Sequence, residues 1–225
     1  WPKKSILVLE RSAIPAGAST RNAGFACFGS LTEVLSDIDT IGNEGARFLL
    51  ENRWKGIQIT RNRLGDRAIG FEGKGGFELI EASGMSALNR IDEVNSLVKD
   101  FAPDYIQLKN TLGGIQTSKG QEIVSMRDEG QLHSGKLMRA LESHCSSNGV
   151  SFRTGVSVQS FEKVNGIFEV QVDDAFRSKL MYKSTLLIDC TNAFSKANIE
   201  PGRGQVILTQ PIQKLKFQGN LHIDE

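Results

Sequence analysis

The part of this sequence best suited to binding a ligand is a carboxylate followed by a run of small and polar residues. The apolar segment 5–10 (SILVLE) ends in Glu10, and the segment 16–24 (AGASTRNAG) follows shortly afterwards. Small residues let a ligand approach the backbone closely, while hydroxyl, guanidinium and amide groups can hydrogen-bond to it. We therefore interpret residues 16–24 as a binding loop.

Two strands are expected to position the candidate ligands. The segment 5–10 lacks strict alternation of apolar and polar residues, which is typical of a parallel strand buried on both faces. The segment 184–190 (STLLIDC) has the same character and is closed by Thr191-Asn192-Ala193. Because ligands of open α/β sheets bind beyond the carboxyl ends of strands, Thr191 and Asn192 are further candidates, although a simple strand-end turn explains them too.

Helical spacing of apolar residues predicts several helices. Two or three are expected within residues 31–64, where Gly42, Gly45 and Gly56 are expected breaks. Two more are predicted over residues 86–101 and 132–145.

The remaining predicted strands fall into two groups. Strands near residues 76–80, 105–108, 115 and 122–126 suggest a small mixed sheet in a second domain. A strand at 150–152 precedes a β-meander, in which segments 156–161 and 166–172 flank the hairpin signal Asn165-Gly166. The order of elements predicts an α/β fold: a parallel sheet with a β-meander, interrupted by an α+β domain.

Composition excludes several functional classes. The 225 residues are 39% hydrophobic, and 27 Lys+Arg against 26 Asp+Glu give a formal charge of +1, which provides no general attraction to nucleic acid. The three cysteines suit neither a disulfide scaffold nor a zinc knuckle, so we expect a reducing, cytoplasmic setting. No apolar run reaches the ~20 residues of a membrane-spanning helix.

The binding loop and two later segments resemble one known family. Residues 7–11 and 17–24, followed by 187–194 (LIDCTNAF) and 201–205 (PGRGQ), are similar to FAD-dependent enzymes of the D-amino-acid oxidase, glycine oxidase and sarcosine oxidase superfamily. The resemblance implies a Rossmann-type, glutathione-reductase-like FAD-binding sheet. It also implies FAD-binding parts at residues 1–63 and 132–205, with substrate-domain parts at 64–131 and 206–225.

The resemblance implies a role in FAD binding for a defined set of residues. Glu10 would accept hydrogen bonds from the adenosine ribose, and the backbone of Val156 would contact adenine. Residues 21–24 would run beneath the isoalloxazine ring, where backbone N–H groups stabilise negative charge on the reduced flavin. The full set of candidates is Glu10, Arg11, Ser19, Thr20, Arg21, Asn22, Ala23, Gly24, Val156, Thr191 and Asn192.

Each of these candidates also has a structural explanation. A solvated acid at a strand end, an exposed arginine, a surface turn or a valine in a hairpin core would account for the same residues. The other chemically capable residues favour structural roles: the three histidines have no metal-ligand spacing, Cys27 suits a small buried hydrophobe, and Trp54, Phe77, Tyr105 and Tyr182 suit core packing.

The sequence departs from the family pattern at one important place. None of its 23 glycines stands in a Gly-x-Gly-x-x-Gly turn, which in this family places the FAD pyrophosphate at a helix N-terminus. The resemblance places that turn before Trp1 and the groups that anchor a substrate carboxylate after Glu225. We therefore expect both ends to be cuts through a larger protein.

The resemblance implies a function: oxidation of the C–N bond of an amino acid or amine by hydride transfer to FAD, with the catalytic residues unassigned. Three alternatives stay open. They are oxidation of a 2-hydroxy acid, a flavin module within an RNA-modifying enzyme, which the near-neutral charge disfavours, and a cofactor-free scaffold domain of the same fold.

Overall fold

The fold of the chain is given by a computed structural model. It describes residues 4–109, 111–113, 117–174, 180–194, 202, 207, 209–210, 212–213 and 217–223. The chain forms two compact units, each built from separate stretches of sequence. Unit 1 comprises Trp1–Arg21 and Leu141–Ile207, and unit 2 comprises Asn22–Ala140 and Leu208–Glu225. The boundaries between these units differ from the predicted domain boundaries. Residues 22–63, which the resemblance assigns to the FAD-binding part, cluster with unit 2.

Unit 1 contains the first predicted strand in a parallel pair. Strand β1 (Ile6–Glu10) pairs with β7 (Val150–Thr154), so that Glu10 lies opposite Thr154. The parallel direction agrees with the prediction. The predicted burial on both faces is wrong, since Leu7 is 37% and Val8 39% exposed. β7 is the only strand that pairs with β1 within the described residues, so the other edge of β1 has no strand beside it there.

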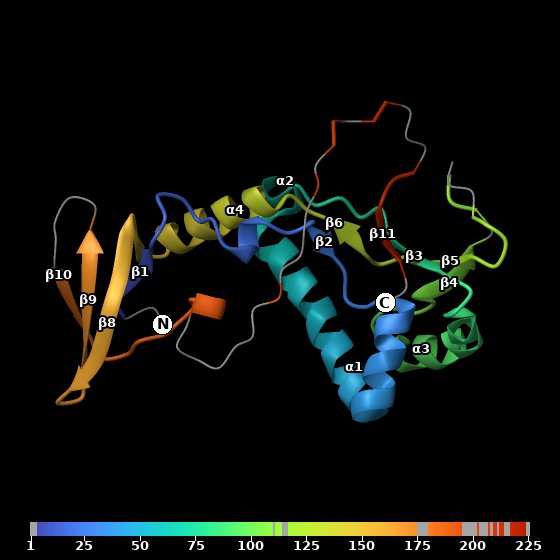
Figure 1. Cartoon of the computed structure of the whole chain (residues 1–225), viewed down its shortest axis with the longest axis horizontal. Helices are drawn as coiled ribbons and strands as arrows, with labels where there is room; N and C mark the ends of the chain where they lie inside the picture. The colour runs from blue at the N-terminus through green and yellow to red at the C-terminus, as the bar shows by residue number, and fades with distance from the viewer. Residues whose placement is uncertain are drawn as a thin grey trace. The chain divides into compact units, whose positions relative to one another are not determined.

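A three-stranded β-meander completes unit 1, as predicted (Figure 1). Asn165 and Gly166 both have positive φ, 48° and 83°, as a two-residue type I′ hairpin turn requires. The predicted strand 184–190 is wrong beyond Ser184: residues 185–190 pair with no described strand, and Ile188 is 65% exposed. The strands are β8 (Val156–Val164), β9 (Ile167–Asp174) and β10 (Leu180–Ser184).

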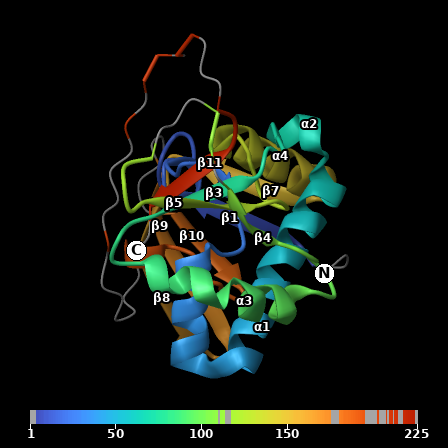
Figure 2. The ribbon, with the colours of Figure 1, turned by 90° about the vertical axis from the view of Figure 1, so that its right-hand side faces the viewer.

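Unit 2 contains the predicted mixed sheet, with strand order β11-β3-β5-β4 (Figure 2). β11 runs parallel to β3, and the other two pairings are antiparallel. A separate short ladder joins β2 to β6. The predicted strand near Ile115 lies outside the described residues. The bounds are β2 (Phe25–Ala26), β3 (Gly76–Ile80), β4 (Ile106–Lys109), β5 (Glu122–Met126), β6 (Gly130–Gln131) and β11 (Asn220–Ile223).

The helices follow the predicted ranges with three corrections. The long helix α1 breaks only at Gly42, where φ 73° and ψ 170° interrupt it, so the predicted breaks at Gly45 and Gly56 are wrong. The predicted helix 86–101 is 3₁₀ at its start and α-helical only over its second part. The bounds are α1 (Leu31–Leu64), α2 (Asp66–Ile69), η2 (Met85–Arg90), α3 (Ile91–Val98) and α4 (Ser134–Ser147). Within the described part of the chain, no helix has the length and apolar character needed to cross a membrane.

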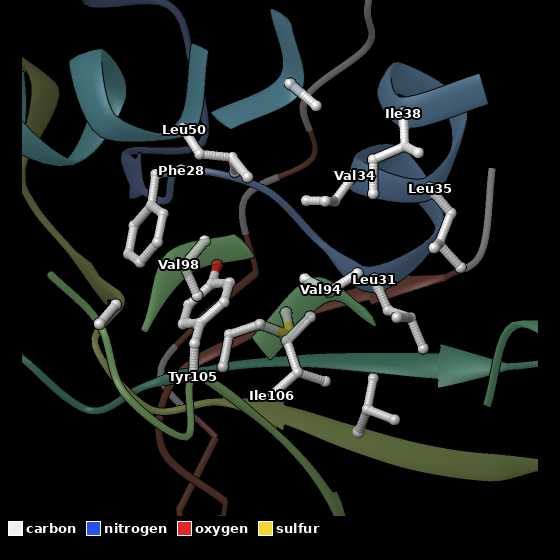
Figure 3. Packing of buried hydrophobic residues seen from close by; sticks show 14 of the residues in the cluster. Phe28, Leu31, Val34, Leu35, Ile38, Leu50, Val94, Val98, Tyr105 and Ile106 are labelled. Atoms are coloured by element: carbon white, nitrogen blue, oxygen red, sulfur yellow. The ribbon is translucent and has the colours of Figure 1, made fainter. Parts of the chain in front are cut away.

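The main hydrophobic core lies in unit 2, between α1, α3 and the mixed sheet (Figure 3). The rings of Phe28 and Tyr105 stack with centroids 4.2 Å apart. Leu31 and Leu50 of α1 and Val98 of α3 are fully buried. Because Phe28 lies between β2 and α1, this core fixes the segment that follows the predicted binding loop.

Candidate functional site

The carboxyl ends of β1 and β7 bring two predicted site residues together in unit 1. Glu10 is the last residue of β1 and lies opposite Thr154. The backbone N–H of Gly155 donates to the carbonyl oxygen of Ser12 at 3.0 Å. This bond ties the chain after Glu10 to the start of β8, where Val156 is 2% exposed. Glu10 and Val156 therefore lie at one edge of unit 1.

One of the two carboxylate oxygens of Glu10 accepts a hydrogen bond within the turn that follows β1. Its Oε1 accepts a hydrogen bond from the backbone N–H of Ser12 at 2.8 Å. Its Oε2 has no hydrogen-bond partner among the described residues, and the side chain is half-buried. A half-buried acid with one oxygen available can accept hydrogen bonds from the hydroxyl groups of a ligand.

A contact of Arg11 links the turn that contains Thr191 and Asn192 to the edge of unit 1 at which Glu10 lies. The Arg11 guanidinium lies over the ring of Phe194, 4.8 Å from its centroid, in a cation–π contact. Thr191 and Asn192 stand three and two residues before this phenylalanine, and Asn192 begins the short 3₁₀ turn η3 (Asn192–Phe194) with a φ of 53°. The backbone N–H and the hydroxyl of Thr191 both donate to Asp189 Oδ1, at 2.9 and 2.6 Å.

The first half of the predicted binding loop forms a short 3₁₀ turn, η1 (Ala18–Thr20). The hydroxyl of Thr20 lies 3.0 Å from the carbonyl oxygen of Gly17 and 3.3 Å from that of Pro15, so its proton is used within the loop. Ser19 and Arg21 are exposed. The loop therefore presents its own backbone and the Arg21 side chain rather than a free Thr20 donor.

The second half of the loop is anchored within unit 2. Oδ1 of Asn22 accepts from the N–H of Gly24 at 2.9 Å and from the hydroxyl of Ser134 at 2.8 Å. Gly24 has a φ of 77°, and a Cβ added there would lie 2.2 Å from the carbonyl oxygen of Leu132. Asn22 and Gly24 thus hold the loop against the start of α4, and Ala23 between them is exposed.

A buried carboxylate that the sequence analysis did not single out, Glu129, follows β5. Its Oε1 accepts hydrogen bonds from the backbone N–H groups of Phe28 and Gly29 at 3.0 and 3.4 Å. The Tyr105 hydroxyl lies 2.7 Å from the same Oε1 and shares its proton with the carbonyl oxygen of Gly29 at 2.6 Å. Burial raises the pKa of Glu129 to about 7, although these three donors oppose the rise. Burial, reinforced by the Glu129 carboxylate, also raises the pKa of the nearby Cys27 thiol to about 11, so this thiol stays protonated at neutral pH.

A second buried carboxylate, Glu78 on β3, caps the N-terminus of α1. It accepts from the backbone N–H of Leu31 at 2.7 Å and from the N–H and hydroxyl of Thr32. Together, Glu78 and Glu129 bind four of the five backbone N–H groups from Phe28 to Thr32. One signal was present in the sequence: the glutamate within the strand GFELI interrupts a series of apolar residues.

Comparison with known proteins places the chain in a family. Residues 2–224 match the family model described as FAD dependent oxidoreductase. The chain belongs to this family. FAD, the predicted cofactor, is the cofactor of the family, and the predicted α/β class is confirmed. Comparison with the sequences of curated proteins gave no match.

Three solved structures share the fold of this chain at low sequence identity. The L-amino acid deaminase from Proteus vulgaris superposes with a TM-score of 0.55 and 16% identity, over 75% of this chain and 38% of its own. Glycine oxidase from Geobacillus kaustophilus superposes with a TM-score of 0.52 and 16% sequence identity, over 76% of this chain and 45% of its own. Iminodiacetate oxidase from Chelativorans sp. BNC1 superposes with a TM-score of 0.52 and 16% sequence identity, over 79% of this chain and 47% of its own. The chain therefore spans less than half the length of each of these proteins.

The residues at the edge of β1 suit the adenosine part of FAD in their chemistry. Glu10 offers a carboxylate oxygen that can accept hydrogen bonds from ribose hydroxyls. Arg11, the next residue, is an exposed cation. The hydroxyls of Thr20 and Thr191 already donate within the chain, so toward a ligand they are acceptors. Phosphate oxygens need donors, and in this part of the chain these are backbone N–H groups and guanidinium groups.

Proposed function

We propose that this chain forms part of the FAD site of a flavin-dependent oxidoreductase that oxidises the C–N bond of an amino acid or amine. The observation that carries the proposal is the meeting of Glu10, Arg11, Val156 and the Thr191–Phe194 turn at the carboxyl end of β1. In open α/β sheets, nucleotides bind at this end of the strands. We propose further that β1 and β7 belong to a Rossmann-type parallel sheet.

Two groups of residues would hold FAD at its two ends. Glu10 would accept hydrogen bonds from the ribose hydroxyls through Oε2, and the Val156 backbone would contact the adenine. Arg11, Ser19, Thr20, Thr191 and Asn192 would line the phosphates and ribose. Arg21, Asn22, Ala23 and Gly24 would lie along the isoalloxazine ring.

The structural role of Asn22 and Gly24 supports a preorganised flavin loop. The Asn22 carbonyl group is held by Gly24 N–H and Ser134, and Gly24 adopts a left-handed conformation against Leu132. A loop fixed in this way can aim backbone N–H groups at developing negative charge without reorganising during the reaction. Asn22 is therefore proposed to act through the loop backbone rather than by a direct contact with the ring.

The reaction divides between cofactor and protein. FAD, when bound, supplies the hydride acceptor for the carbon beside the amine, and the imine product is hydrolysed by water. The chain itself would hold the cofactor and orient it through the loop. The named substrates of the related proteins, glycine, iminodiacetate and L-amino acids, are the first to test.

An absorbance spectrum of the full-length protein tests the proposal. We expect flavin bands, either as purified or after reconstitution with FAD, and bleaching of these bands under anaerobic conditions by an amino acid or amine. Bleaching only by 2-hydroxy acids would overturn the substrate class. A folded protein that takes up no FAD would overturn the proposed function and favour a scaffold domain.

A further inference from the structure

The carboxyl group of Glu129 is bound very differently at its two oxygens. Oε1 accepts from the backbone N–H groups of Phe28 and Gly29, and it lies 2.7 Å from the Tyr105 hydroxyl, whose single proton is shared with the carbonyl oxygen of Gly29 at 2.6 Å. Oε2 is buried and has no hydrogen-bond partner among the described residues. It lies against Gly76, where an added Cβ would come within 2.1 Å of it. A buried oxygen without a donor is costly, and the cost is greatest when that oxygen carries negative charge.

A second acceptor without a partner lies on the same face of the sheet. Asn220 on β11 is the register neighbour of Gly76 on β3, so its side chain extends to the same face as the missing Gly76 Cβ. Asn220 Nδ2 donates to the carbonyl oxygen of Gly130, the residue after Glu129, at 2.5 Å. Its Oδ1 is buried without a partner in the described part of the chain. Glu129 Oε2 and Asn220 Oδ1 are thus two unpartnered acceptors on one face of the sheet, both located beside Gly76, and of these two groups only the carboxyl can gain a proton.

We propose that Glu129 is a positioning residue for the flavin loop, and that its carboxyl group carries a proton on Oε2 that it donates to Asn220 Oδ1. One proton then satisfies both unpartnered oxygens while Oε1 continues to accept from Phe28 and Gly29. Loss of the proton strengthens the bonds at Oε1 and breaks the bond to Asn220. The backbone at residues 28 and 29 therefore responds to the protonation of Glu129.

This inference rests on the proposed function, because it is the flavin loop that transmits the change. Residues 28 and 29 follow β2, and β2 directly follows Gly24 at the end of the loop. Gly24 and Phe25 are coupled to the chain beside Glu129 through the β2–β6 ladder, in which Ala26 pairs with Gly130. A shift at Glu129 thus reaches the loop from both sides of this short ladder.

Other titratable or charged groups surround Glu129 and have to be separated from it. Glu33 and Arg53 of α1 form an ion pair at 2.8 Å, and Arg53 also lies 3.5 Å from the carbonyl oxygen of Phe28. His222 lies two residues beyond Asn220 on the same face, with its Nε2 buried and unpartnered among the described residues. The groups to consider are Cys27, Glu33, Arg53, Glu78, Tyr105 and His222.

The test is a pH titration of the flavin absorbance spectrum in the full-length, FAD-loaded protein. We expect a reversible shift of the flavin bands with a midpoint near the Glu129 pKa of about 7. Glu129→Gln should abolish the shift and hold the low-pH spectrum at every pH, since its amide mimics the protonated acid: the carbonyl accepts at Oε1 and the NH₂ donates to Asn220. A merely structural role would give no pH-dependent spectrum. Two results would overturn the inference but not the proposed function. One is a protein that contains flavin and whose spectrum does not change with pH, and the other is a Glu129→Gln variant that retains the transition.

Two further variants and a second readout keep the inference falsifiable. His222→Gln should leave the midpoint in place, and loss of the transition in this variant would assign it to His222 instead. Asn220→Ala removes the proposed acceptor of the Oε2 proton and should move the midpoint downward, so an unchanged midpoint contradicts the proposal even if Glu129→Gln does not fold. If the protein binds no FAD, infrared spectroscopy tests the protonation of Glu129 directly. The C=O band of a protonated carboxyl group should be present below a pH of about 7, lost above it and absent in Glu129→Gln.

Discussion

The carboxylate of Glu78 lies 2.7 Å from the backbone nitrogen of Leu31, so that a buried acid in the mixed sheet closes the N-terminus of α1. The first N–H groups of a helix have no partners within the helix, and the helix dipole favours a negative charge beside them. Glu129 binds the N–H groups of Phe28 and Gly29 in the same way. The segment between the flavin loop and α1 is therefore held by two side chains from elsewhere in unit 2.

Glu78→Ala should destabilise unit 2 strongly. The substitution leaves the N–H groups of Leu31 and Thr32 and the Thr32 hydroxyl without their acceptor in a buried environment, at a cost of about 3 kcal/mol. Denaturant unfolding of the full-length protein measures the loss. Glu142→Ala, at an exposed position of α4, is the control and should change stability by less than about 0.5 kcal/mol. Equal effects of the two substitutions would show that the Glu78 cap contributes nothing specific.

Gly24→Ala should be more harmful than an alanine at another glycine of similar φ. Gly24 (φ 77°) lacks room for a methyl group because Leu132 O would be 2.2 Å away, whereas Gly166 (φ 83°) has open space. Alanine at Gly166 carries only the cost of a left-handed backbone, about 1 kcal/mol. Gly24→Ala adds a backbone clash, so we expect a loss of about 3 kcal/mol and a lower flavin content. Thermal unfolding and the ratio of flavin to protein absorbance measure the two effects, and similar losses at both positions would show that the Leu132 segment gives way.

Local sequence patterns correctly predicted the elements whose structure depends only on residues adjacent in the sequence. The Asn165-Gly166 turn and its two strands form as expected because the turn residues tolerate positive φ. The segment 185–190 has the composition of a strand but does not form one, since a strand also needs a partner and composition does not specify pairing. Glu10 and Val156 lie at one edge because β1 pairs with β7, which leads directly into β8, whereas the turn that follows Thr191 is linked to this edge only by the contact of Arg11 with Phe194.

The burial of the two carboxylates does not follow from alternation, for a different reason. In the strand GFELI, alternation alone would place Phe77 and Leu79 in the core and Glu78 in solvent, but the structure buries Gly76, Glu78 and Ile80. The register is decided by distant partners: the Leu31 N–H group needs an acceptor, and Glu78 supplies it. Glu129 likewise gains its role only when Phe28 and Tyr105, both distant in sequence, are brought to it.

Glu129 should make stability fall as pH rises through neutrality. Its pKa is raised from 4.5 to about 7 on folding, so between these values the folded state binds more protons than the unfolded state. The contribution is complete below about pH 4.5 and is lost as pH rises through about 7, with a size on the order of 3 kcal/mol. Urea unfolding at a series of pH values should show this loss in the wild type and not in Glu129→Gln. Parallel pH profiles of the two proteins would contradict the assignment.

Glu10→Ala should weaken FAD binding with little effect on folding. The substitution removes the oxygen offered to the ribose and the acceptor of the Ser12 N–H, which lies in a half-buried turn that water can reach. Loss of one hydrogen bond to a charged group corresponds to about 2 kcal/mol, so the dissociation constant for FAD should rise by roughly 30-fold. Quenching of flavin fluorescence during titration of the apoprotein measures this constant. Glu162→Ala, at an exposed position on β8, is the matched control and should leave FAD affinity unchanged. An unchanged constant in Glu10→Ala would remove the carboxylate from the cofactor site and reduce it to the support of its own turn.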